Sequence, residues 1–341
     1  MSFSASQRIA LDVMGGDNAP LAVLQGALQA VAEDGPWKLP AGRVLLVGDQ
    51  AVIHAFLDAH GARERFLVQH ASEVIGMAES PATALRAKPD ASINVCVKAV
   101  KSGAAGAIVS MGNTGAVVGA STLGLGTLAG VKRPGIAVTL KLTQHPITIL
   151  DMGAHIAPKA QHLVQYGLMG AVYARDCLGI ANPRVGLLNI GEEASKGTDL
   201  LKEAYPLLAA SKFDFVGNVE SSGLFKGVAD VIVTDGFTGN VVLKLMEEFS
   251  GFILKLVLGE LKAHSVQWGP EALGKIKKHI DYAEYGGALL LGVQGIVVKG
   301  HGRSDANAVS NALVQALRAL DAGVNQHIVQ GLAEAGATVE S

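Results

Sequence analysis

Aromatic residues and cysteines are scarce in this chain of 341 residues. Aromatics make up 5% of the sequence, and the two cysteines are Cys96 and Cys177. The cysteines lack metal-like spacing and lie in segments that we expect to be helical, so we expect no metal centre, and a reducing cytoplasm is the simplest compartment. With 42 glycines beside so few aromatics, the composition favours tight turns and close helix–sheet packing over a β-sandwich.

The chain also lacks a large excess of charge and a membrane-spanning run. Its net charge is -2 at pH 7, so no basic field points to a nucleic-acid partner. No uninterrupted apolar run reaches the roughly 18 residues that span a bilayer, and the first residues have no apolar core of the signal-peptide type. We expect a cytoplasmic protein, with any membrane contact peripheral.

Familiar catalytic signatures are absent as well. The sequence contains no GxSxG elbow, no HExxH, no Walker lysine loop and no CxxC, and we expect no cofactor. Neither cysteine lies at a glycine-rich turn, so a thiol nucleophile is not expected. If the chain performs acyl chemistry, the nucleophile comes from a substrate.

Short runs rich in Val, Ile and Leu alternate with helix-length segments. The runs rarely alternate with polar residues, which indicates a mainly parallel sheet covered on both faces. The expected strands are residues 8–13, 43–47, 66–69, 106–110, 136–140, 147–151, 185–190, 214–217 and 231–234, with a late hairpin at 288–291 and 296–299. The expected helices are 21–33, 93–101, 161–175, 195–210, 305–319 and 324–335.

This alternation predicts a three-layer α/β/α fold. We find no linker-like stretch and no internal repeat, so we expect a single domain over 1–341. The region 241–283 has no obvious strand and is expected to form a lobe of two or three helices.

The stretch IALDVMGGDNAP, from Ile9 to Pro20, reads as a strand, a glycine turn and a helix start. That arrangement commonly holds an anion in α/β proteins. It is not the dinucleotide fingerprint, because the third glycine is missing. Its candidate site residues are Asp12, Gly15, Gly16 and Asp17. The alternative is a strained turn with a capping aspartate.

A second strand–loop–helix pattern contains Gly112, Asn113, Thr114 and Gly115. Its backbone N–H groups would point at an anion, and the Asn113 and Thr114 side chains would add donors. Taken alone, the motif favours an ordinary Asn or Thr helix cap.

Other predicted strand ends carry further polar and glycine residues. His155 is a conceivable acid or base, although a surface histidine is the simpler interpretation. Solvated turns or helix starts are the alternatives for the remaining loops. Their candidates are Arg133, Gly191, Glu192, Lys196, Asp235, Gly236, Gly239, Asn240, Lys244 and His301.

Together these motifs make the chain resemble the bacterial phosphate acyltransferases of phospholipid synthesis, the PlsX family. The resemblance covers nearly the whole length. It rests on ALDVMGGDNAP from Ala10, ESPATALRAK from Glu79, VSMGNTGAVVGAS from Val109, KRPGIA from Lys132, ILDMGAHI from Ile149, LVQYGLMGAVYA from Leu163, VGLLNIGEEASKG from Val185, GNVE from Gly217, DGFTGNVVLK from Asp235 and YGGALLLGVQGIVVKGHG from Tyr285.

The resemblance implies transfer of a long-chain fatty acyl group from acyl carrier protein to inorganic phosphate. The product is acyl phosphate, which a membrane acyltransferase uses. It further implies a sheet of the isocitrate dehydrogenase and phosphotransacetylase type and a homodimer. The chain departs from the family pattern in two places: GAHIA follows Met152 where relatives commonly read GANVD, and Ser221-Ser222-Gly223 replaces Gly-Arg-Asp.

On this basis we assign phosphate binding to the backbone of 112–115, helped by Asn240 and by Lys196 or Lys244. The Gly15–Gly16 turn would donate to the oxyanion. Asp12, Asp17 and Asp235 would orient lysines and turns or carry protons, and His301 is a candidate general acid.

The apolar segment 252–259, flanked by lysines, is expected to be a dimer or core helix. The alternative is a peripheral contact with membrane lipid or a membrane acyltransferase. Three other functions stay open: a short-chain phosphotransacetylase using coenzyme A, an isocitrate dehydrogenase-like oxidoreductase and a non-catalytic scaffold.

Overall fold

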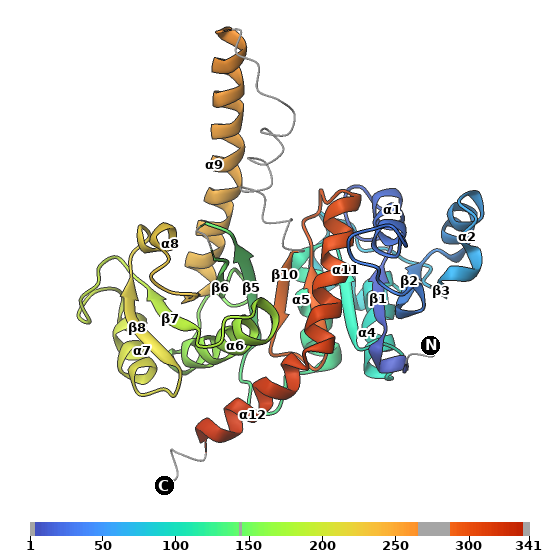
Figure 1. The fold of residues 1–341 in the computed structure, drawn as a ribbon. Helices are drawn as coiled ribbons and strands as arrows, with labels where there is room; N and C mark the ends of the chain where they lie inside the picture. Colours follow the sequence, from blue (N-terminus) through green and yellow to red (C-terminus); the bar gives the residue numbers. More distant parts are fainter. Residues whose placement is uncertain (1–3, 143–144, 265–286, 337–341) are drawn as a thin grey trace. The chain divides into compact units, whose positions relative to one another are not determined.

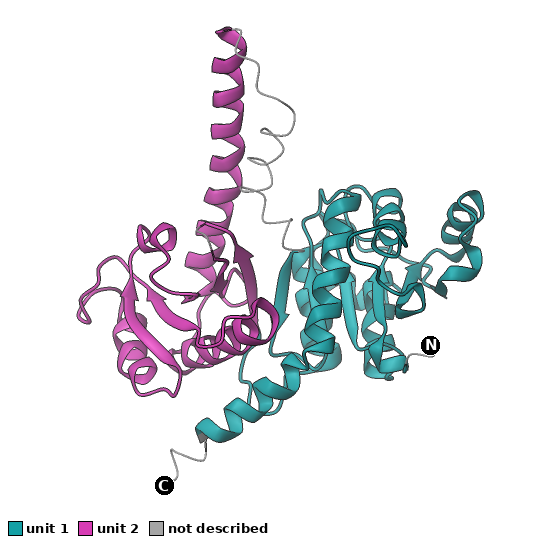
Figure 2. Cartoon of the chain, in the orientation of Figure 1, with its two compact units in different colours: residues 1–134, 285–341 teal, residues 135–284 magenta. Residues whose placement is uncertain are grey.

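A computed structural model describes residues 4–142, 145–264 and 287–336. The chain divides into two compact units (Figure 2). Unit 1 comprises residues 1–134 and 285–341, and unit 2 comprises residues 135–284. Unit 1 is therefore built from two separate stretches of the sequence. The expectation of a single domain stays a prediction.

The sheet of unit 1 is parallel except for one strand. Its order is β3-β2-β1-β4-β11-β10, and only β10 runs antiparallel to its neighbour β11. The hairpin expected at 288–299 is thus confirmed. The strands are β1 (Ile9–Asp12), β2 (Val44–Gly48), β3 (Leu67–His70), β4 (Ala107–Ser110), β10 (Ala288–Leu291) and β11 (Ile296–Lys299).

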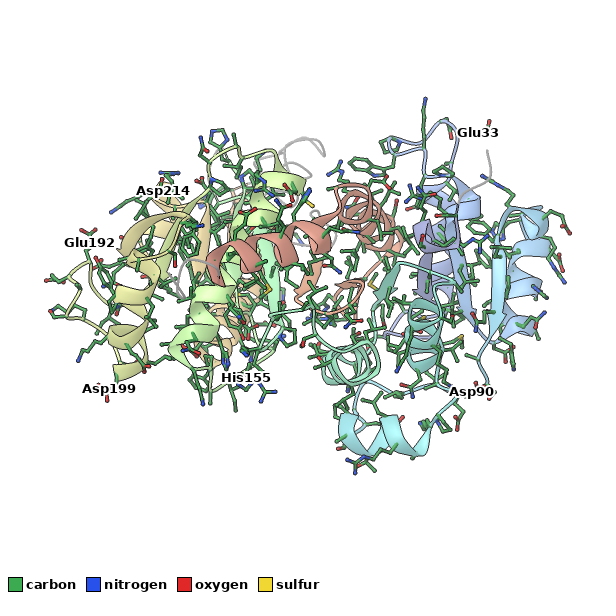
Figure 3. The ribbon with its side chains drawn as sticks, turned by 90° about the horizontal axis from the view of Figure 1, so that it is seen from below. Glu33, Asp90, His155, Glu192, Asp199 and Asp214 are labelled. Atoms are coloured by element: carbon green, nitrogen blue, oxygen red, sulfur yellow. The ribbon has the colours of Figure 1, made fainter. Side chains whose placement is uncertain are left out.

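Helices cover both faces of this sheet (Figures 1 and 3). On one face α1 (Leu21–Ala30) packs against α11 (Ala306–Asp321), and α4 (Ser92–Lys101) packs against α5 (Thr114–Leu125) on the other. Strands buried on both faces need apolar side chains throughout, which is what β1, β2 and β4 supply. The remaining helices of this unit are α2 (Gln50–Ala59), α3 (Pro81–Ala87) and α12 (Val324–Gly336), with short 3-10 turns η1 (Ala5–Gln7), η2 (Ala41–Arg43) and η3 (Arg63–Arg65).

The sheet of unit 2 follows the same principle. Its order is β5-β6-β9-β7-β8, and only β5 is antiparallel. The strands are β5 (Gly135–Leu140), β6 (Ile147–Leu150), β7 (Arg184–Leu188), β8 (Asp214–Val219) and β9 (Val231–Val233). Helices α6 (Ala160–Leu178) and α7 (Asp199–Ala209) pack against this sheet and each other, and α8 (Gly223–Lys226) is a single turn. The α/β class and the mainly parallel sheets are confirmed.

The lobe of two or three helices expected at 241–283 can be compared with the structure as far as residue 264, and there it begins as a helix. One helix, α9, runs without a break from Gly236 to Ala263 over 28 residues, or roughly 42 Å at 1.5 Å per residue. It extends away from the sheet of unit 2 (Figure 1), and its buried residues are Gly236 and Gly239. Residues 265–283 lie outside the described part of the chain. No helix among the described residues is long and apolar enough to cross a membrane.

Candidate functional site

A buried carboxylate ends the first strand of unit 1. Asp12 is 2% exposed. Its Oδ2 accepts a hydrogen bond from Ser110 Oγ at 2.6 Å, and its Oδ1 accepts one from the Met14 N–H at 3.3 Å. Burial raises the pKa of Asp12 above its ordinary value, and these hydrogen bonds offset part of that rise. The chain keeps this costly group at the carboxyl end of β1, where α/β sheets place ligand sites.

The glycine turn after β1 is required by close packing. A Cβ atom on Gly15 would lie 2.6 Å from Asp12 Oδ2 and 2.9 Å from the Gly112 nitrogen. Gly16 has φ +109°, a backbone conformation that other residues rarely adopt. The turn therefore lies directly against the loop that follows β4.

That second loop opens α5, and Asn113 is its cap. Asn113 Oδ1 accepts from the Ala116 N–H at 3.1 Å, while Nδ2 donates to the carbonyls of Met77 at 2.9 Å and Glu79 at 3.2 Å. The side chain is thus engaged as a cap, which was the alternative that the sequence offered. Thr114 and Gly115 are exposed residues, and within the described part of the chain no acceptor is assigned to their N–H groups. These two N–H groups are therefore available to bind a ligand at the start of α5.

A third loop, which follows β11, meets the glycine turn. The Asp17 N–H donates to the Gly302 carbonyl at 2.7 Å. Asn18 Nδ2 donates to the carbonyls of Arg303 at 3.1 Å and Ser304 at 3.2 Å. His301 Nδ1 accepts from the Arg303 N–H at 3.1 Å, so this loop also fixes the orientation of the imidazole.

Unit 2 also has a buried carboxylate at the end of a strand. Asp151 is 0% exposed. Its Oδ1 accepts from the N–H groups of Ile136 at 2.9 Å, Gly153 at 3.1 Å and Ala154 at 2.9 Å, and its Oδ2 accepts from His155 at 2.7 Å. Burial raises the pKa of Asp151, and the four N–H groups oppose that rise.

The start of α9 packs on this carboxylate loop. The Gly236 N–H donates to the His155 carbonyl at 3.0 Å, and a Cβ on Gly153 would lie 3.4 Å from the Asn240 side chain. Asp235 caps the helix, because Oδ1 accepts from the Thr238 N–H at 2.8 Å and Oδ2 from Thr238 Oγ1 at 2.7 Å.

The predicted cationic side chains have fewer and weaker contacts than the buried carboxylates. Lys196 lies 4.0 Å from Glu193 on the loop after β7, and Lys244 pairs with Glu247 at 3.0 Å on α9. Glu192, on the same loop as Lys196, is exposed (Figure 3), and the neighbouring Gly191 admits no side chain without displacing Lys196 or Glu193. Arg133 is exposed just before β5. Among the described residues no group of three His, Cys, Asp or Glu side chains is placed to hold a metal ion.

The structure thus brings most predicted residues together in two sets, one in each unit. The unit 1 set contains Asp12, Gly15, Gly16, Asp17, Gly112, Asn113, Thr114, Gly115 and His301. The unit 2 set contains Asp235, Gly236, Gly239 and Asn240. Asp151 and Ser110 lie within the sequence motifs ILDMGAHI and VSMGNTGAVVGAS, but the sequence predicted no role for them. A polar residue directly after an apolar strand was the available signal for both.

Comparisons with known proteins agree on a family. A family model described as "Fatty acid synthesis protein" matches residues 7–327. A phosphate acyltransferase from Heliobacterium modesticaldum is 46% identical over 96% of this chain and 97% of its own length. One from Dictyoglomus turgidum is 43% identical over 95% and 97%.

Solved structures with a similar fold include two phosphotransacetylases. The one from Streptococcus pyogenes has a TM-score of 0.63 at 16% identity, covering 93% of this chain and 94% of that one. EutD phosphotransacetylase from Staphylococcus aureus has a TM-score of 0.60 at 15% identity, covering 93% and 95%. At these identities the likeness concerns the fold, and it agrees with the phosphotransacetylase type of sheet that the resemblance implies.

Proposed function

Since the chain belongs to the fatty acid synthesis protein family and is an acyltransferase, we propose that it transfers a long-chain fatty acyl group from acyl carrier protein to inorganic phosphate. The product would be acyl phosphate for phospholipid synthesis. The observation that carries this proposal is the start of α5, where Thr114 and Gly115 are exposed residues whose N–H groups have no acceptor among the described residues. N–H groups at a helix start favour an anion, and phosphate is the anion of this reaction.

The proposed reaction needs no nucleophile from the protein. A phosphate oxygen attacks the thioester carbonyl carbon, and the carbonyl oxygen becomes an oxyanion. The C–S bond then breaks, the acyl group stays on phosphate, and the thiolate takes a proton. The chain has to align the two substrates, stabilise the oxyanion and supply that proton.

The proposed roles are given unit by unit. In unit 1, Thr114 and Gly115 hold phosphate; in unit 2, Asn240 and one of Lys196 or Lys244 are the proposed assisting residues. The Gly15–Gly16 turn donates to the oxyanion, and His301, whose ring is held through Nδ1, is the proton donor. Asp12 and Asp17 do not bind phosphate directly, because an ionised carboxylate repels it. Their proposed role is to hold the turns in place.

The decisive experiment measures phosphate-dependent consumption of long-chain acyl carrier protein, with the acyl phosphate trapped by hydroxylamine. We expect trapped hydroxamate only when phosphate, enzyme and acyl carrier protein are all present. A matched reaction with acyl coenzyme A tests the short-chain phosphotransacetylase alternative. Absence of hydroxamate with the carrier-protein substrate contradicts the proposal, and faster reaction with a short-chain coenzyme A thioester favours the alternative.

We also propose that the chain forms a homodimer through α9. Large apolar side chains on this helix are exposed, and a stripe of them follows one face at spacings of three and four residues: Phe237, Val241, Leu245, Phe249, Phe252 and Leu256. Such a stripe needs a covering partner. A second copy is the partner we favour, and peripheral binding to membrane lipid is the alternative outcome of the test given in the Discussion.

A further inference from the structure

Two short sequence motifs occur once in each unit. Residues 14–20 read MGGDNAP and residues 152–158 read MGAHIAP. Residues 112–118 read GNTGAVV and residues 236–242 read GFTGNVV. The expectation of no internal repeat is therefore wrong at the level of motifs. The copies are short and far apart, so their relation becomes clear only from their places in the fold.

The two copies of each motif occupy equivalent places. The first motif follows β1 in unit 1 and β6 in unit 2, and leads into α1 and α6. The second follows β4 and β9, and leads into α5 and α9. β1 pairs in parallel with β4, and β6 pairs in parallel with β9. Each unit thus places the two motifs on adjacent strands at the same edge of its sheet.

Each unit has a buried carboxylate just before its first motif: Asp12 stands two residues before Met14, and Asp151 stands one residue before Met152. Asp12 lies opposite Ser110 in the sheet register, and the Asp151 N–H donates to the Thr234 carbonyl at 3.1 Å. Ser110 and Thr234 each stand two residues before a glycine of the second motif. A Cβ on Gly112 would lie 3.6 Å from Asp12 Oδ2, and a Cβ on Gly236 would lie 2.7 Å from Asp151 Oδ2.

From this correspondence we infer that Asp151 is a positioning residue for phosphate, the counterpart in unit 2 of Asp12 in unit 1. The inference rests on the proposed function, in which Asn240 assists phosphate binding. Asp151 holds the His155 N–H, and the His155 carbonyl holds the Gly236 N–H. The Asp151 carboxylate therefore fixes the first turn of α9, and Asn240 follows directly after that turn.

The two copies differ in what they offer to an anion. At the start of α5 the N–H groups of Thr114 and Gly115 have no acceptor among the described residues. At the start of α9 the Thr238 N–H is taken by the Asp235 side chain and the Gly239 N–H by the Asp235 carbonyl. The N–H groups of Thr238 and Gly239 are thus occupied in the unit 2 copy, and its proposed contribution is the Asn240 side chain.

The test replaces Asp151 by Asn, which is isosteric. The amide oxygen can still accept from Ile136, Gly153 and Ala154, whereas the amide NH₂ cannot accept from the His155 N–H. Asp230→Asn is the matched control, because Asp230 is a buried carboxylate at the other end of β9, held by the Arg184 backbone and side chain. The readouts are phosphate KM, kcat at saturating phosphate, and the rise in thermal midpoint that inorganic phosphate produces.

We expect Asp12→Asn and Asp151→Asn each to raise the phosphate KM by about tenfold or more and to reduce the phosphate-induced rise in thermal midpoint. Asp230→Asn should lower the thermal midpoint while leaving both phosphate readouts within about twofold of wild type. A residue with a merely structural role would behave as Asp230 does.

A second pair of variants covers the case in which Asp151→Asn fails to fold. In Gly236→Ala the new methyl group meets the His155 carbonyl oxygen at 2.6 Å and Asp151 Oδ2 at 2.7 Å, whereas in Gly251→Ala, on the same helix, it meets nothing within 4 Å. We expect only Gly236→Ala to raise the phosphate KM.

The outcomes separate the inference from the proposed function. If wild type forms acyl phosphate but Asp151→Asn and Gly236→Ala match their controls, Asp151 has no positioning role and the proposed function stands. If wild type forms no acyl phosphate, the proposed function fails, and the thermal-midpoint measurement decides the inference. If phosphate does not stabilise wild type either, the inference falls too.

Discussion

Two residues in this chain carry charges that folding disfavours. Asp12 and Asp151 are buried, and burial raises the pKa of both carboxyl groups. Neither carboxyl is recorded in an ion pair with a described residue, so each depends on N–H and hydroxyl donors alone. A chain under selection for stability alone would replace such groups, and their retention at strand ends points to function.

The raised pKa of Asp12 makes the stability of the protein depend on pH. The folded state holds the Asp12 proton more tightly than the unfolded state does. The stability contribution of this proton is therefore fully present below the ordinary carboxyl pKa and is lost as pH rises through the raised pKa of the folded state. Asn cannot lose that proton, so the stability of Asp12→Asn relative to wild type should increase with pH.

Urea unfolding of both proteins from about pH 4 to about pH 8 checks this expectation. The same variant is expected to bind phosphate less well, so the gain in stability should accompany a loss of function. A free-energy difference between the two proteins that is constant over this range would contradict the buried-carboxylate argument.

Asn113 joins the start of α5 to the loop before α3 through one side chain. Asn113→Ala removes the cap of α5 and both bonds to the Met77 and Glu79 carbonyls. The lost cap alone costs about 1 kcal/mol of stability. Because the first turn of α5 would lose its fixed position, we expect phosphate-dependent turnover to fall by about a hundredfold.

Asn113→Ser is the control for this change, since serine keeps a capping oxygen but cannot reach both carbonyls. Its stability should lie between that of wild type and that of Asn113→Ala. Turnover of Asn113→Ala within a few-fold of wild type would show that the start of α5 does not hold phosphate.

At the scale of elements, the strands were the most predictable part of the fold. Each expected strand lies within two residues of an observed one, because buried parallel strands are short apolar runs bounded by glycine or polar residues. Helices α2 and α3 did not emerge from the sequence: α3 is seven residues long, and α2 buries only Ile53 and Leu57, which gives a weak periodic signal.

The loops of the candidate site were predictable from the sequence, but their contacts were not. Glycine turns and polar strand ends identified most of the loops. The occupation of the Asn113 side chain by the Met77 and Glu79 carbonyls depends on partners more than thirty residues away, and no local pattern reports them. For 241–283, the lack of a strand-like run predicted helices, and α9 confirms a helix as far as Ala263.

The contact between α1 and α11 depends on a missing side chain. A Cβ on Gly26 would lie 2.5 Å from Val309 Cβ and 2.6 Å from the Ala306 carbonyl oxygen. Gly26→Ala should therefore destabilise the protein by roughly 1–3 kcal/mol, because the helices have to separate. Gly42→Ala is the control, since its methyl group meets nothing within 4 Å. Equal unfolding midpoints for the two variants in urea would contradict this packing.

At the scale of the whole molecule, the proposed homodimer has the exposed face of α9 as its interface. Leu256 belongs to the apolar stripe and is 50% exposed. Leu258 lies about 200° around the helix from it and serves as the control. We expect Leu256→Glu to weaken dimerisation by about tenfold or more, because a charge would be buried in the interface, whereas Leu258→Glu should have little effect.

Sedimentation velocity measures the dimer, and flotation with liposomes measures lipid binding. Loss of the dimer without any lipid binding by wild type supports the homodimer. A monomeric wild type that floats with liposomes, and no longer does so after Leu256→Glu, would replace the dimer with a membrane contact.

The division of unit 1 into two stretches of sequence has a consequence for biosynthesis. β4 pairs on one side with β11, and α1 packs on α11, yet β11 and α11 follow the whole of unit 2 in the chain. A ribosome therefore completes residues 135–284 before it makes the strand and helix that finish unit 1. Until then the nascent chain exposes the edge of β4 and the inner face of α1, so under the proposed function the last-made part sets when phosphate can first be bound.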